Sequence, residues 1–179
     1  MPSKPRIYGL MAEFDTPEAL LEAAKRAYAA GYRRMDAYSP FPVEGLATAI
    51  GFGRPRLPLI VLIGGLVGGV GGFFMQYYAS VISYPLNVGG RPFNSWPAFI
   101  PVAFETTILV AAVTAVLGML ALNGLPRPHH PVFNVQRFEH ASSDKFFLCI
   151  EASDARFEPV QTRQFLQETS PREVVDVDF

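Results

Sequence analysis

The sequence has almost no cysteine and few groups that could hold a redox centre. Cys149 is the only cysteine among 179 residues, so an internal disulfide is impossible and cysteine-rich zinc or iron–sulfur sites are excluded. Covalent haem attachment needs a Cys-x-x-Cys-His pair, which the sequence also lacks. Cys149 lies in the apolar run 146–150, and we interpret it as a buried strand residue.

Strong net charge and recognisable catalytic sets are missing as well. The formal net charge is −1, so there is no basic field for nucleic acid. No Ser/His/Asp set, phosphate-binding loop or carboxylate pair stands out. His129 and His130 are adjacent, and adjacent side chains of an extended segment point in opposite directions, so one metal ion cannot easily take both. We therefore interpret these histidines as solvated or in contact with lipid headgroups, and expect no metal, cofactor or catalytic residue in this chain.

Charged residues are almost absent from the middle of the chain. About 70 consecutive residues, from Leu57 to Pro126, carry only Arg91 and Glu105 as charged residues. About 20 helical residues of apolar character cross the hydrocarbon core of a bilayer. The sequence therefore predicts a membrane hairpin, with transmembrane helices at 57–82 and 98–122 and a connecting loop at 83–97.

The two flanks of the hairpin carry ordinary charge and resemble soluble protein. Each flank is small for an independent core, so we expect residues 1–56 and 123–179 to be the two halves of one domain. Arg54 and Arg56 precede the first span and Arg127 follows the second. The positive-inside rule then places both termini in the cytoplasm and the loop outside. The apolar run at residues 7–12 is too short for a signal peptide, which agrees with this orientation.

The flanks have the patterns of an α+β domain. A helix is predicted to begin at residues 15–18, where Asp15 can cap it, and to end at Gly31. Strands are predicted on both sides of this helix, a short helix near 44–50, and a second helix further on. This order fits a ferredoxin-like split βαβ domain interrupted by the membrane hairpin. The predicted strands are 7–14, 32–38, 132–140, 145–152 and 173–179, and the later helix is 157–168.

Glycine is concentrated in the first span, in two helical registers. In lipid, small residues let helix backbones approach closely, and van der Waals packing then drives association. One partner for this face is the chain's own second span, which offers a stripe of small residues. Because two helices alone cannot cover both registers, we also expect another subunit to pack here. The first register is Gly64, Gly68 and Gly72, the second is Gly65 and Gly69, and the opposing stripe is Thr107, Ala111, Thr114 and Gly118.

Glu105 lies about two turns into the second span, nearer to the outer side. A carboxylate inside a membrane is costly, and its presence is by default a functional hypothesis. Three interpretations stay open: a glutamate bonded locally to Thr106 or to loop backbone, an anchor into a neighbouring subunit, and a member of a proton relay.

Six short stretches are spread over nearly the whole chain: YGLMAEF at 8–14, YSPFP at 38–42, YPLNVGGRP at 84–92, NSWP at 94–97, FE at 104–105 and HPVF at 130–133. Together they resemble one family, the ActD subunit of bacterial alternative complex III, which is a quinol-oxidising membrane assembly of respiration or photosynthesis.

The resemblance implies an accessory subunit of an electron-transport complex in the bacterial inner membrane, with two spans and a cytoplasmic domain. It implies that haem c, iron–sulfur clusters and quinol belong to partner subunits, namely cytochrome c subunits, an iron–sulfur subunit and multi-span quinol-binding subunits. The apolar, aromatic outer loop, with Arg91 and Trp96, would contact a periplasmic subunit, and lipids would surround the hairpin.

Two other classes of function remain as alternatives. The first is a free-standing membrane-anchored sensor or regulator whose ferredoxin-like domain binds a small ligand. The second is a two-helix transporter component, which would need polar residues that line a path, and Glu105 with Gln76 is a weak basis for one.

Overall fold

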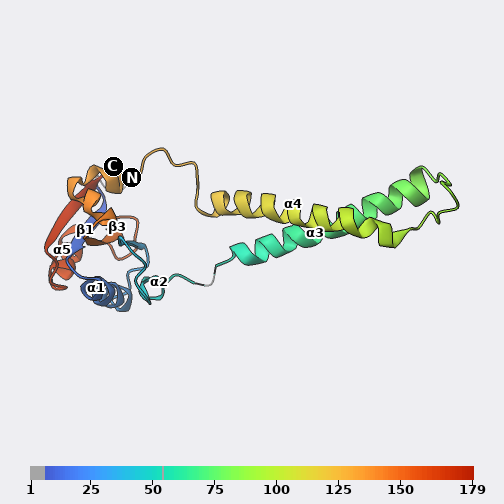
Figure 1. Ribbon diagram of the computed structural model, residues 1–179. Helices are drawn as coiled ribbons and strands as arrows, with labels where there is room; N and C mark the ends of the chain where they lie inside the picture. The colour runs from blue at the N-terminus through green and yellow to red at the C-terminus, as the bar shows by residue number, and fades with distance from the viewer. Residues whose placement is uncertain (1–6, 54) are drawn as a thin grey trace. The chain divides into compact units, whose positions relative to one another are not determined.

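The computed structural model describes residues 7–53 and 55–179, which divide into two compact units (Figure 1). The first unit runs up to Gly53 and resumes over Pro128–Phe179, and the second is Arg54–Arg127. The second unit is therefore an insertion into the sequence of the first.

The first unit is built on one antiparallel sheet whose strands come from both halves of the chain. The strand order is β2-β3-β1-β4, and β1 pairs with β3 from Gly9–Glu151 to Phe14–Phe146. Strands from the N-terminal and C-terminal halves therefore alternate across the whole sheet. The four strands are β1 (Ile7–Phe14), β2 (Met35–Tyr38), β3 (Phe146–Glu151) and β4 (Glu173–Asp178). The expectation of a mixed helix-and-sheet domain beside two apolar helices is confirmed.

Each face of the sheet has its own buried cluster, because successive strand residues point to opposite faces. On one face, Leu10, Phe14 and Leu148 pack against the helices α1 (Pro17–Ala29) and α5 (Pro159–Gln167). The short helix α2 (Leu46–Ala49) adds to this cluster. On the other face, the buried residues are Met11, Phe147, Cys149 and Val177, which pack with Val132 and Phe138.

Two local predictions about this domain are wrong. Thr16, rather than Asp15, caps α1, since its side chain accepts the N–H of Ala19 at 3.3 Å. The Asp15 carboxylate instead accepts hydrogen bonds from Lys145 at 2.8 Å and Arg172 at 3.2 Å. Asp15 is therefore engaged by side chains from the far half of the sequence, which local spacing does not reveal. The predicted end of the helix is confirmed by Gly31, whose φ is +99°.

The predicted strand at 132–140 is also wrong. This segment forms two 3-10 helices, η2 (Pro131–Asn134) and η3 (Gln136–Ser142). Pro131 begins η2, where its missing N–H costs nothing, and the Nδ1 atom of His130 accepts the Val132 N–H at 3.4 Å. Val132 and Phe138 are buried with the second face of the sheet, so this apolar segment packs against the strands and does not extend them.

The second unit is a hairpin of two long apolar helices (Figure 1). The first is α3 (Leu57–Tyr77), which continues as the π-helix η1 (Tyr78–Ser83), and the second is α4 (Trp96–Leu122). Both are long and apolar enough to cross a membrane. The prediction of two such helices at 57–82 and 98–122 is confirmed, with boundaries that differ by one or two residues.

Candidate interface of the membrane hairpin

The first glycine register of α3 packs directly against α4. A Cβ atom on Gly68 would lie 2.5 Å from the carbonyl oxygen of Thr106 and 2.8 Å from the Cβ atom of Val110. Gly64 and Gly72 face the side chains of Thr114 and Thr106 just as closely. Only a residue without a side chain leaves room for this approach of the two helices.

The second register meets the same helix. A Cβ atom on Gly65 would lie 3.6 Å from the Cβ atom of Ala111, and one on Gly69 would lie 2.6 Å from the Thr107 hydroxyl. At the other end, a Cβ atom on Gly118 of α4 would lie 3.2 Å from the Leu57 side chain. The structure therefore brings together all the glycines and small residues singled out in the sequence, and it does so within one chain. By contrast, a Cβ atom on Gly71 would meet nothing within 4 Å.

A polar contact that the sequence did not predict closes the loop end of the hairpin. The side-chain amide of Gln76 donates to the carbonyl oxygen of Phe99 at 2.9 Å and to that of Gly72 at 3.2 Å. This contact ties the end of α3 to the first turns of α4. The signal in the sequence was a single amide in an apolar helix, because such a group must find a partner in hydrocarbon.

The outward surface of the hairpin is formed by large apolar side chains. Leu66 and Val70 of α3 are 60% and 70% exposed, and Phe104 of α4 is 63% exposed. Within α3 and α4, Glu105 is the only charged residue. A surface of this kind is covered either by lipid tails or by apolar surfaces of other subunits.

Glu105 lies exposed on α4, and its carboxylate has no hydrogen bond or ion pair with the residues that the structure describes. The hydroxyl of its neighbour Thr106 donates to the carbonyl oxygens of Val102 at 2.9 Å and Ala103 at 3.0 Å. The local interpretation of Glu105, a bond to Thr106 or to the loop backbone, is therefore not what the structure contains.

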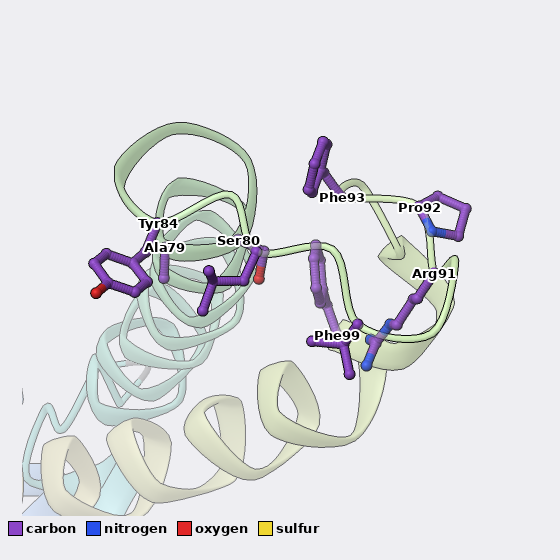
Figure 2. A pocket seen from close by; sticks show the side chains of 9 residues that line it. Ala79, Ser80, Tyr84, Arg91, Pro92, Phe93 and Phe99 are labelled. Atoms are coloured by element: carbon purple, nitrogen blue, oxygen red, sulfur yellow. The ribbon is translucent and has the colours of Figure 1, made fainter.

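In the loop between α3 and α4, Arg91 lines a hollow and Trp96 does not. Trp96 begins α4 and is 55% exposed. Arg91 follows Gly89 and Gly90, whose φ values of +59° and +76° turn the chain, and it lines a hollow of about 340 Å³ with Ser80 and Phe99. Figure 2 shows the Arg91 side chain extending from the loop toward the side of the hollow where Phe99 lies. Trp96 does not line this hollow.

Cys149 and His130 pack within the folded domain, while His129 is exposed. Cys149 is 1% exposed, and burial, with the nearby carboxylates of Asp36 and Glu151, raises the pKa of its thiol to about 12. The ring of His130 packs edge-on against Tyr8 at a centroid distance of 5.3 Å. Among residues 7–53 and 55–179, no three His, Cys, Asp or Glu side chains are grouped so that they could hold a metal ion.

Comparison with known proteins gives one family. A family model described as "Alternative complex III, ActD subunit" matches residues 8–176. The match runs from β1, through the whole hairpin, into β4. No curated protein matches the chain.

Proposed function

The chain belongs to the ActD subunit family of alternative complex III, and from this premise we propose that it docks its hairpin against larger membrane subunits of that complex as a non-catalytic component. Its glycine faces are filled by its own second helix, so the docking surface is the outward, apolar one. This surface carries one group that lipid tails cannot satisfy, the Glu105 carboxylate.

Glu105 is the observation that carries the proposal. A carboxylate in the apolar part of a helix needs a hydrogen-bond donor or a cation, and lipid tails supply neither. No described residue of the chain supplies one either. A neighbouring subunit that presents an Arg, Lys, His or hydroxyl side chain at the same depth would satisfy it and fix the register of docking.

The rest of the proposal concerns the domain and the outer loop. The cationic flanks of the hairpin support a cytoplasmic domain in the bacterial inner membrane, where it would cover partner subunits. The alternating strand order and the helices on one face of the sheet support its assignment as ferredoxin-like. The exposed Trp96 would contact a periplasmic subunit. Haem c, iron–sulfur clusters and quinol would be held by the cytochrome, iron–sulfur and multi-span partners.

The first test is purification of the tagged chain from native membranes in mild detergent. Co-purification of multihaem cytochrome, iron–sulfur and multi-span subunits is expected. A stable, monodisperse chain without partners would contradict the proposal and favour the free-standing sensor.

Two variants at one position then separate the two remaining roles of Glu105. Glu105→Leu is expected to lower partner recovery about tenfold, because a buried partner group is left unpaired. An anchor predicts that Glu105→Gln, which still hydrogen-bonds, keeps both recovery and quinol oxidation. If Glu105 instead belongs to a proton relay, Glu105→Gln should leave the recovery of partner subunits normal and slow quinol oxidation. Full recovery with Glu105→Leu would remove Glu105 from the interface.

A further inference from the structure

The hollow at the loop end of the hairpin contains the only cation of this unit between its two ends. Arg91 is the one Lys or Arg between Arg56 and Arg127. Its guanidinium has no hydrogen bond or ion pair with the described residues. The hollow measures about 340 Å³ and is lined by Arg91, by Ser80 of η1 and by the aromatic side chains Tyr84, Phe93 and Phe99 (Figure 2). A planar, permanently charged group in this setting is suited to a phosphate oxyanion.

A second hollow lies further along the same helices. It measures about 560 Å³ and is lined only by residues without charge, chiefly apolar ones. Its α3 residues span Gly69 to Tyr77, which corresponds to about 12 Å of helix. This length and polarity suit the upper part of a fatty acyl chain. The lining residues are Gly69, Val70, Phe73, Phe74, Tyr77 and Ala103.

The two hollows lie on one side of the hairpin. Ala103 of the second hollow is one turn beyond Phe99 of the first, and such positions share a helix face. The rings of Phe73 and Phe99, one from each hollow, are in contact at a centroid distance of 5.8 Å. The hollow with Arg91 and the apolar groove are therefore neighbours along the hairpin, with the Phe73 and Phe99 rings between them.

We propose that this side of the hairpin binds one anionic diacyl phospholipid, with its phosphodiester on Arg91 and one acyl chain in the groove between α3 and α4. The loop end of an apolar helix is where headgroups lie, and an aromatic side chain such as Tyr84, which lines the hollow, favours that depth. No acidic residue lines the hollow, so the cation of a zwitterionic headgroup would find no partner there. An anionic lipid fits better because it brings only the charge that Arg91 can neutralise.

The experiment is a lipid titration of the full chain in mild detergent, with bound lipid counted by native mass spectrometry. The probes are dioctanoyl phosphatidylglycerol and dioctanoyl phosphatidylcholine. One molecule of the anionic lipid is expected to bind about tenfold more tightly than the zwitterionic one. Arg91→Gln should reduce this preference to about twofold or less, and Arg91→Lys should keep part of it. Arg127→Gln, which removes one cation at the other end of the hairpin, should leave it unchanged.

The groove is tested separately by Ala103→Phe, which fills it and should weaken both lipids. Equal binding of the two lipids, an unchanged preference in Arg91→Gln, or displacement of phosphatidylglycerol by inorganic phosphate would overturn the proposal, the last by indicating a free-anion site. If Arg91→Gln loses helicity, the Ala103→Phe variant provides the test. Unchanged lipid binding in Ala103→Phe would contradict an acyl chain in the groove. Trp96→Ala, which concerns subunit docking, should not affect lipid binding, so this proposal and the proposed function can fail independently.

Discussion

Asp154 is the residue on which the local geometry of the domain most depends. The residue is 7% exposed, and its carboxylate accepts three backbone N–H groups, from Arg33 and Arg34 at 2.7 Å each and from Arg156 at 2.8 Å. Burial alone would raise the pKa of this carboxyl, but the three hydrogen bonds outweigh it and hold the pKa below its ordinary value. The turn after β3 is thereby fixed to the residues that precede β2.

This geometry predicts a pH-dependent effect of Asp154→Asn. A depressed folded-state pKa contributes stability that is present above the unfolded value of about 3.9 and is lost as the pH falls through the folded pKa. Asp154→Asn should therefore lower the free energy of unfolding of the domain by about 1.5–3 kcal/mol near neutral pH, and by less at acidic pH. Hydrogen exchange of the Arg33 and Arg34 amides in the full chain measures this.

Asp178→Asn is the matched control, since Asp178 lies exposed on β4 and should leave those amides unaffected. An equal loss of protection for Asp154→Asn at neutral and acidic pH would show that the charge of Asp154 is not what stabilises the turn.

Single residues differ in how far the sequence reveals their role. Burial of Cys149 follows from its apolar neighbours, which are local. The role of Asp154 does not, because the amides it binds lie 120 and 121 positions earlier in the chain. Glu13 is similar: it is 4% exposed and pairs in a bidentate manner with Arg137, at 2.6 Å for both contacts. Only the fold brings these partners together.

At the scale of elements, the packing of α3 on α4 depends on particular glycines rather than on glycine content. Gly68→Ala should lower the stability of the hairpin by about 1–3 kcal/mol, because its Cβ atom would press on the backbone of Thr106. Gly71→Ala is the control, since its Cβ atom has open space, and should change stability by less than about 0.5 kcal/mol. Trp96 is the only tryptophan and reports unfolding in dodecyl sulfate titrations. Equal dodecyl sulfate midpoints of unfolding for Gly68→Ala and Gly71→Ala would contradict the close contact of Gly68 with α4.

The sequence predicts well those elements whose pattern extends over many residues or is bounded by clear start and end residues. The two apolar helices followed from the absence of charge, and α1 from its first turn and its terminal glycine. The segment 132–140 was mispredicted because its apolar residues fit a strand and a pair of 3-10 helices equally well. Which of the two forms depends on the faces that the sheet leaves uncovered, and this is not encoded locally. The glycine registers and their partner stripe on α4 were found in the sequence. The expectation that α4 alone could not cover both registers was wrong, because all five of these glycines meet α4.

At the scale of the whole molecule, neither half of the domain can form the sheet alone. β1 pairs with β3 on one side and β4 on the other, and both of those strands follow the hairpin. The fragment 123–179 is therefore expected to lack cooperative unfolding, because its two strands would have to pair without the central β1. Circular dichroism with urea checks this, and the full chain in detergent is the control. A sigmoidal transition in the isolated fragment would show that the two strands and α5 suffice.

The alternation of strands also determines when the sheet can form during synthesis of the chain. During synthesis β1, α1 and β2 leave the ribosome first, yet the strand that joins β1 to β2 is made only after both apolar helices. The edges of the early strands stay unpaired until both apolar helices and then β3 have been synthesised. The sheet can therefore close only after the whole hairpin has been synthesised, and until then the growing chain presents open strand edges to proteases and chaperones.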